Sequence, residues 1–304
     1  MKRTILVTMI LAAALVCSCK KDGRAGAPSV TWAANSNFAT MEMAPAADGA
    51  VSLNAPGAFE SITLTLGLGD LNLTANPYIG VSANKSSGSK SNPVFDVIDD
   101  STVASFLQGL GMTAGTGLRG KTIATLDLLT ILEKLIEGQP LSNNTNFTIA
   151  IDILDQNGKS FSKTAKFHYT SAPSFSWDGN SSFDAVDLNS TKMACKVKVS
   201  APGKIARLTV TLEPGADSRV TSNVKNRTAS SSTVIDLVND EKAAENFEKY
   251  FPAGKGVTDK TDVTLDFAFM YDWAPDMQSS TNVFTIFVED QNAKTASTIV
   301  KFTK

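Results

Sequence analysis

The chain has 304 residues, a formal charge of −2 and 42% hydrophobic residues, enough for one large domain or two ordinary ones with buried cores. Its 28 basic residues are spread along the whole chain, and this excludes the basic patch expected of a nucleic-acid-binding protein. One histidine and three cysteines leave almost nothing for a zinc site, a Cys–His dyad or a disulfide framework. We therefore expect no cofactor, no metal and no nucleic-acid partner.

The N-terminus has the pattern of a secretion signal. Lys2 and Arg3 precede an uncharged, mostly apolar run over residues 4–16. A run of this length suits the core of a signal peptide and is shorter than the roughly 20 residues that span a bilayer. We assign residues 1–18 to a signal peptide and expect no other membrane-spanning segment.

Residues 16–19, at the end of this run, resemble the lipobox of bacterial lipoproteins. That motif has an aliphatic residue three places before the cysteine and a small residue directly before it, and Val16 and Ser18 occupy these places before Cys19. The resemblance implies cleavage before Cys19 and acylation of its side chain, and Lys20 in the next position implies the outer membrane as the address. The alternative is an ordinary secretory signal cleaved nearby.

The rest of the chain contains an internal repeat. Segments recur in the same order, with an offset that drifts only by small insertions and deletions, among them 27–32 with 172–177, 51–57 with 197–203, 62–66 with 208–212, 96–100 with 236–240, and 155–157 with 290–292. A repeat of this kind indicates two copies of one structural unit. We predict a lipidated tether over residues 19–26, a first module over 27–170 and a second over 171–304.

Each copy reads as mainly β. Val197 and Val199 alternate with polar residues, and so do Leu208 and Val210, which is the period of a half-buried strand. Residues 290–292 have the composition of a hairpin turn between two further alternating runs. Short strands at this spacing predict a β-sandwich.

One short helix interrupts each copy. Val103, Phe106 and Leu107 have helical spacing after an acidic start, and Ala243 and Phe247 do the same in the second copy. A further helix is expected only in the first copy, where apolar residues recur with helical spacing from residue 128 to 135. The equivalent part of the second copy alternates like a strand, and the structure of residues 263–278 stays open.

The end of each copy, an alternating strand followed by Asp-Gln-Asn and a strand with a basic residue before Phe, resembles the end of bacterial Ig-like modules. Together with the lipobox, the whole chain resembles a Bacteroidetes-type cell-surface lipoprotein with tandem Ig-like domains. The resemblance implies a mainly β fold of two tandem Ig-like β-sandwich modules, each with a short inserted helix, and a cell-surface location. It implies no particular activity.

Catalytic candidates are few. The acidic pairs at 99–100 and 240–241 could serve as the two carboxylates of a glycosidase, but both stand at a helix start, where acidic side chains cap amide groups. Adjacent helix residues also do not face one another. His168 has no counterpart in the second copy and no evident orienting partner. We expect no catalytic residue.

The aromatic residues offer one binding candidate. Trp32 and Trp177 occupy the same position of the repeat, so core packing explains both. Tyr271, Trp273 and Met277 belong to a segment without an aromatic counterpart in the first copy, and exposed aromatic rings next to acidic residues suit sugar stacking. The alternative is that this segment packs inward.

These observations favour a non-enzymatic outer-membrane or cell-surface lipoprotein that binds a glycan or a host ligand, or serves in display. A structural or fimbria-like assembly subunit is the alternative, and a carbohydrate-active enzyme is the third. The expected partners are the membrane, through the N-terminal lipid anchor, and a glycan or surface protein. An exposed flat aromatic patch would favour sugar binding, an unpaired edge strand would favour strand addition, and converging carboxylates would favour an enzyme.

Overall fold

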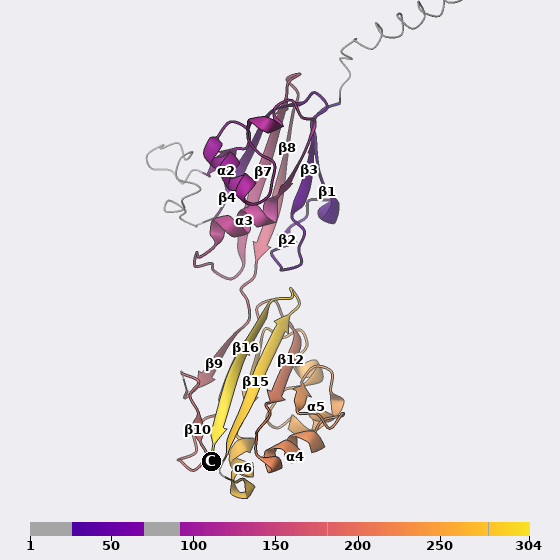
Figure 1. Ribbon diagram of the computed structural model, residues 1–304. Helices are drawn as coiled ribbons and strands as arrows, with labels where there is room; N and C mark the ends of the chain where they lie inside the picture. The colour runs from indigo at the N-terminus through magenta and orange to yellow at the C-terminus, as the bar shows by residue number, and fades with distance from the viewer. Residues whose placement is uncertain (1–25, 70–91, 181, 279) are drawn as a thin grey trace, which may run out of the picture.

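The computed structural model describes residues 26–69, 92–180, 182–278 and 280–304. Their strands form four sheets, and each half of the chain contributes one sheet of five strands and one of three. Figure 1 shows the two halves as separate bodies joined where β8 leads into β9. The predicted fold class, two tandem Ig-like β-sandwich modules, is confirmed.

Module 1 is the sandwich formed before β9. Its three-stranded sheet has the order β1 (Ser29–Trp32), β3 (Ala50–Asn54) and β6 (Ile123–Asp127). Its five-stranded sheet has the order β2 (Met41–Glu42), β8 (Ser160–Tyr169), β7 (Thr145–Asp155), β4 (Phe59–Gly67) and β5 (Val94–Asp96). Neighbouring strands are antiparallel, except that β2 runs parallel to β8.

Module 2 repeats this topology strand for strand. The three-stranded sheet has the order β9 (Ser174–Asp178), β11 (Lys196–Ser200) and β14 (Asp262–Asp266). The five-stranded sheet has the order β10 (Val186–Asp187), β16 (Thr295–Thr303), β15 (Thr281–Asp290), β12 (Ile205–Leu212) and β13 (Val234–Asp236). The pairing of β4 with β7 and that of β12 with β15 each shift register once, at corresponding places, so the repeat extends to local irregularities.

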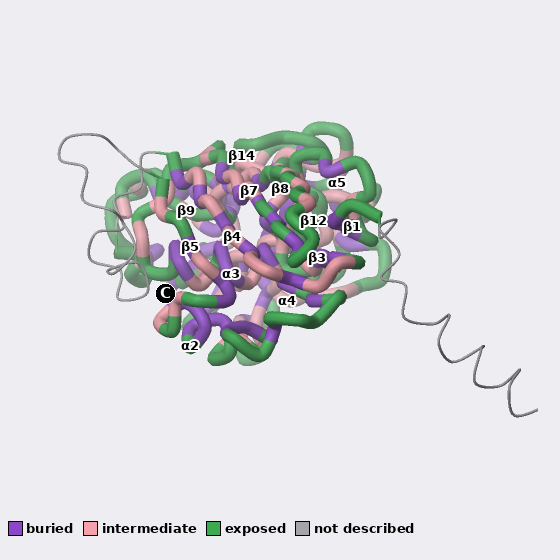
Figure 2. The backbone as a smooth tube through the Cα atoms, turned by 90° about the horizontal axis from the view of Figure 1, so that it is seen from above, coloured by how far each residue is buried: buried purple, intermediate pink, exposed green. Residues whose placement is uncertain are grey.

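The alternation read from the sequence is the burial pattern of the strands. Along β15, Phe284, Ile286 and Val288 are fully buried and alternate with partly exposed residues. Each module encloses its own hydrophobic core between its two sheets. Figure 2 shows buried stretches inside and mostly exposed loops around them.

Short helices connect the strands. Module 1 has α2 (Ser101–Gly109) and α3 (Leu128–Ile136), and module 2 has α4 (Ser218–Asn226), α5 (Glu241–Phe247) and α6 (Phe269–Trp273). The described residues also form four 3-10 helices: η2 (Ala33–Asn35), η3 (Thr116–Leu118), η4 (Gly254–Gly256) and η5 (Ala274–Asp276). Among the described residues, none of the helices has the length and hydrophobicity needed to cross a bilayer.

One sequence expectation is wrong. A helix after the third strand of the small sheet was expected only in module 1, yet α6 stands in module 2 where α3 stands in module 1. The strand β14 ends at Asp266, whose carboxylate accepts a hydrogen bond from the amide of Ala268 at 2.9 Å. Phe267 and Phe269 are both buried. The alternation of apolar residues in the sequence therefore continues past the end of the strand, although the chain has already turned there.

Candidate functional site

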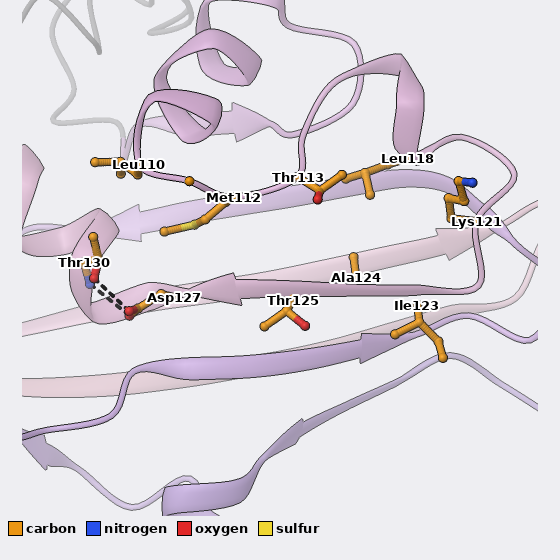
Figure 3. A pocket seen from close by; sticks show the side chains of 11 residues that line it. Leu110, Met112, Thr113, Leu118, Lys121, Ile123, Ala124, Thr125, Asp127 and Thr130 are labelled. Carbon is orange, nitrogen blue, oxygen red and sulfur yellow. Dashed lines mark hydrogen bonds between the residues drawn. The ribbon is translucent and has the colours of Figure 1, made fainter.

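A groove of about 570 Å³ runs along β6 in module 1. The segment after α2 forms one wall and β6 forms the other, as Figure 3 shows. Its lining combines apolar side chains with threonines and one charge at each end: Leu110, Gly111, Met112, Thr113, Leu118, Lys121, Ile123, Ala124, Thr125, Asp127 and Thr130. This volume falls within the range of about 300–1,000 Å³ that small-ligand and cofactor sites occupy.

Local structure holds the first wall in place. The chain leaves α2 at Leu110, and Gly111 has φ +80°, a left-handed conformation that favours glycine. The amide of Met112 donates to the carbonyl of Leu107 at 3.0 Å, and the side chain of Gln108 donates to the carbonyl of Ala114 at 2.9 Å. These bonds tie the wall to the helix that it follows.

The second wall is an edge strand. The amide of Ala55 donates to the carbonyl of Thr122 at 2.8 Å, and the amide of Leu128 donates to the carbonyl of Gly49 at 3.0 Å. In this stretch, the backbone N–H and C=O groups of the even-numbered residues therefore point toward β3. In an antiparallel pair the backbone groups of the intervening residues point the other way. The N–H and C=O groups of Ile123 and Thr125 therefore face away from β3. Within the described part of the chain, β6 pairs with no strand on that side.

The charged residues of the groove suit binding better than catalysis. Asp127 caps α3, because its carboxylate accepts from the amide of Thr130 at 3.1 Å and from the hydroxyl of Thr130 at 2.7 Å. Lys121 is exposed at the other end of β6. The only carboxylate in the groove lining therefore caps a helix. The groove has a negative charge at one end and a positive charge at the other.

Module 2 provides an internal comparison. Counted from the capping residues Asp100 and Asp240, Gly111 corresponds to Phe251. Phe251 is fully buried and contacts three further rings, at centroid distances of 5.1 to 5.6 Å from Phe247, Phe267 and Phe269. The space along the small sheet's edge that is open in module 1 is thus filled by aromatic rings in module 2.

The edge strand of module 2 is covered at one end. The amide of Asp266, the last residue of β14, donates to the carbonyl of Tyr250 at 2.9 Å, so the chain after α5 covers this end of the strand. Within the described part of the chain, β14 pairs with no strand on that side. Asp127 and Leu110 hold the corresponding positions in module 1, and among the described residues their backbone groups form no such bond. Sequence reasoning missed the groove, although the exchange of an aromatic pair for Leu110 and Gly111 was a visible signal.

The aromatic segment singled out from the sequence is packed against module 2. The ring of Trp273 is half-buried, with its centroid 4.6 Å from that of Phe269 and with the guanidinium of Arg227 5.2 Å away. Tyr271 is half-buried too, and its hydroxyl accepts from the amide of Met193 at 3.1 Å. Both rings are thus partly covered by neighbouring side chains, Tyr271 also by the ammonium group of Lys192 at 5.5 Å.

Met277 does not fit the expected binding surface. Its side chain is 6% exposed and belongs to the core of module 2, and its sulfur lies 3.8 Å from the side-chain nitrogen Nδ2 of Asn282. The chain turns inward at this point because η5 ends just before it. A ligand at the surface of Tyr271 and Trp273 would not reach Met277.

One residue of each acidic pair serves as a helix cap. Asp100 accepts from the amides of Thr102 and Val103, and Asp240 accepts from that of Ala243. Asp99 instead pairs with Arg119, which also contacts Glu60, all at 2.7 Å. These carboxylates raise the pKa of the exposed guanidinium of Arg119.

The remaining candidate residues have no catalytic surroundings among the described residues. His168 lies half-buried on β8 with its Nδ1 2.9 Å from Oδ1 of Asn146. Cys195 is a buried free thiol. The described residues include no group of three or more His, Cys, Asp and Glu side chains that could hold a metal ion. Cys19 lies outside the described residues.

No protein-family model matches the chain, and no curated protein does. Among solved structures, the fibronectin(III)-like modules of Clostridium thermocellum CbhA match at 8% identity and a TM-score of 0.25, over 91% of this chain and 93% of theirs. A Ca²⁺-stabilized adhesin with which an Antarctic bacterium binds ice matches at 15% identity and a TM-score of 0.29, over 92% of this chain and 49% of that one. The chain thus spans about half the length of that adhesin. Likenesses this distant say nothing about what the chain binds.

Proposed function

We propose that this chain is a non-enzymatic lipoprotein of the outer membrane or cell surface that carries a binding groove on its first module. The observation that supports binding is the groove along β6, which is open in module 1, while aromatic rings fill the equivalent space in module 2 and the chain covers the last residue of its edge strand. An open edge with unmade backbone hydrogen bonds is a feature that proteins ordinarily cover unless it serves an interaction.

The lipid anchor is supported by the lipobox-like residues before Cys19. Acyl chains attached there would hold both modules at a membrane without a spanning helix. Labelling of cells with a palmitate analogue should mark the wild-type protein and leave Cys19→Ala unlabelled. Equal labelling of both proteins would contradict the anchor, and a cleaved, unlabelled wild-type protein would indicate an ordinary secretory signal.

A binding role is favoured over hydrolysis by what the acidic residues do. Asp127 caps α3, Asp100 and Asp240 cap α2 and α5, and Asp99 pairs with an arginine. A glycosidase needs two carboxylates on opposite sides of one bond. The groove places only Asp127 on its lining, so its contacts favour capture of a ligand.

The binding role can be tested with the chain from residue 20 onward on a glycan array and on an array of surface proteins. Ile123→Lys adds a charge to the rim of the groove at a side chain that is 67% exposed, so the fold should be unaffected. Ile299→Lys is the matched control, because Ile299 is an exposed apolar residue of module 2. We expect loss of binding in the first variant alone.

The aromatic segment remains the other candidate for glycan binding. Trp273→Ala should leave binding unchanged if the groove is the site. Loss of glycan binding in a folded Trp273→Ala protein, with Ile123→Lys unaffected, would place the site on module 2.

The free edge of β6 also favours a second function, assembly into a structural or fimbria-like polymer by strand addition. In that case the purified chain should form oligomers whose size grows with concentration, and Ile123→Lys should reduce them. A monomer at all concentrations would exclude assembly by this chain alone.

A further inference from the structure

We propose that the groove of module 1 receives an extended peptide segment of a partner protein, which adds as a strand to the edge of β6 and places one bulky apolar side chain in the groove. This inference rests on the binding role proposed above and names the class of partner.

The first argument is the backbone of β6. Ile123 and Thr125 direct N–H and C=O groups away from β3, and among the described residues no strand meets them. These groups repeat with the period of two residues that an extended chain also has. A peptide strand can pair with both residues at once, whereas a sugar has no donors and acceptors with that repeat.

The second argument is the way in which module 2 covers the end of its own edge strand. There the edge amide of Asp266 donates to a backbone carbonyl, that of Tyr250, and the next side chain, Phe251, fills the space beneath. The covering group in module 2 is therefore polypeptide, a carbonyl with an aromatic ring beside it. Module 1 has Leu110 and Gly111 at these positions and Asp127 in place of Asp266, so an external chain that runs along β6 as far as Asp127 would supply the same two groups.

The third argument is the lining of the groove. Leu110, Met112 and Leu118 provide apolar surface for an inserted side chain, and Ala124 is small enough to leave room for it. Ile123 is 67% exposed on the outer side of β6, where a side chain of an added strand would cover it. Lys121, at the start of β6, favours an acidic residue at the adjacent end of the peptide.

The test uses a defined probe, an acetylated and amidated heptapeptide of alternating threonine and valine with phenylalanine in the centre. Two further peptides carry N-methyl groups on alternate amides, one in each register, which keeps the side chains but removes the donors of one edge. Amide hydrogen exchange of the chain from residue 20 onward is measured with each. We expect the first peptide to slow amide exchange at Ile123 and Thr125 at least tenfold. Of the two N-methylated registers, at least one should bind at least tenfold more weakly than the first peptide.

Two protein variants complete the test. Thr125→Pro removes an edge donor that faces away from β3, and proline is tolerated at such positions of edge strands. Thr264→Pro is the matched control, because Thr264 holds the equivalent position of β14 in module 2. Peptide binding should fall at least tenfold in Thr125→Pro and stay unchanged in Thr264→Pro. Should Thr125→Pro fail to fold, Ile123→Lys provides the same comparison at an exposed side chain.

Three results would overturn the proposal: equal binding of the peptides with and without N-methyl groups, binding that survives Thr125→Pro, or no protection of β6 by the peptide. If an oligosaccharide protects Ile123 and Thr125 while the peptide does not, the groove is a binding site for a sugar and only the strand proposal fails. If Ile123→Lys also leaves capture of array ligands unchanged, the proposed function of the groove fails as well.

Discussion

The ammonium group of Lys294, in the β15–β16 hairpin of module 2, lies 3.0 Å from the Oε1 of Glu42 at the end of β2 in module 1. The same carboxylate oxygen accepts from the amide of Thr170 at 3.1 Å, and Lys294 also donates to the carbonyl of Thr170. The ring of Tyr169 lies 4.8 Å below the ammonium group. The side chains of Lys294 and Glu42 are only 10% and 23% exposed, so this contact joins the two modules at a partly desolvated point.

We predict that Lys294→Ala loosens the joint between the modules while leaving each module folded. Spin labels at the exposed positions Thr164 and Ser297 should give a narrow distance distribution in the wild type and a broader one in the variant. Glu42→Ala should have the same effect, and the double variant should loosen the joint little further than either single variant. The coupling energy between the two side chains should be on the order of 1 kcal/mol. Lys159→Ala, at the equivalent place in the β7–β8 hairpin, is the control. An unchanged distribution in Lys294→Ala would contradict this role.

The second prediction is that residues 171–304 fold alone. The core of module 2 is enclosed by its own two sheets, and the contact through Lys294 is a small part of its surroundings. The isolated segment should unfold in one cooperative transition with dispersed amide signals in its NMR spectrum. A soluble but unstructured segment would show that the boundary or the independence of the modules is wrong.

The features that the two copies share were predictable from the sequence, and the features in which they differ were missed. The matching segments place equivalent strands in both modules, and the acidic residues Asp100 and Asp240 begin α2 and α5 as expected. The helix α6 was missed because it has only five residues, too few to establish a helical period against the alternation that leads into Phe269. Burial of Met277 depends on the path of the chain through η5, which no local pattern encodes.

The groove could not be predicted for a related reason. The groove exists because no aromatic side chain of the described residues fills the space beside β6. A cavity also depends on side chains that meet from distant parts of the chain. The replacement of Phe251 by Gly111 is readable once the two copies are aligned, but the alignment there depends on a one-residue length difference between the copies. The direction of the free backbone groups of β6 also needs the pairing register, which the sequence does not contain.

The third prediction concerns a close approach that both modules share. A Cβ atom on Gly57 would lie 2.4 Å from the Oδ2 of the buried Asp155, and one on Gly203 would lie 2.3 Å from the Oδ2 of Asp290. Gly57→Ala and Gly203→Ala should each lower the free energy of unfolding by about 1–3 kcal/mol, because backbone or carboxylate must shift. Gly117→Ala, where no atom lies within 4 Å of the new Cβ, is the control. Equal stabilities in urea denaturation would contradict the packing.

The last prediction concerns the thiol of Cys195, which is 1% exposed in the core of module 2. Burial, reinforced by the negative charge of Asp266, raises the pKa of this thiol to about 11. Since the unfolded thiol has a pKa of about 8.5, the folded state favours the neutral form. Below about pH 8.5 the thiol's contribution to stability is fully present, and it is lost as the pH rises toward 11.

Two measurements check this. At pH 8 the native protein should react with iodoacetamide far more slowly than the urea-unfolded protein, because the thiolate is the reactive form and the native thiol is both buried and protonated. Between pH 8.5 and about 11 the free energy of unfolding of the chain from residue 20 onward should fall by at most about 1.4 kcal/mol per pH unit on account of Cys195. Cys195→Ala should be less stable at neutral pH, because it leaves a cavity, but should lose this part of the alkaline slope. Rapid native labelling at pH 8, or the same slope in both proteins, would show that Cys195 is not held neutral by the fold.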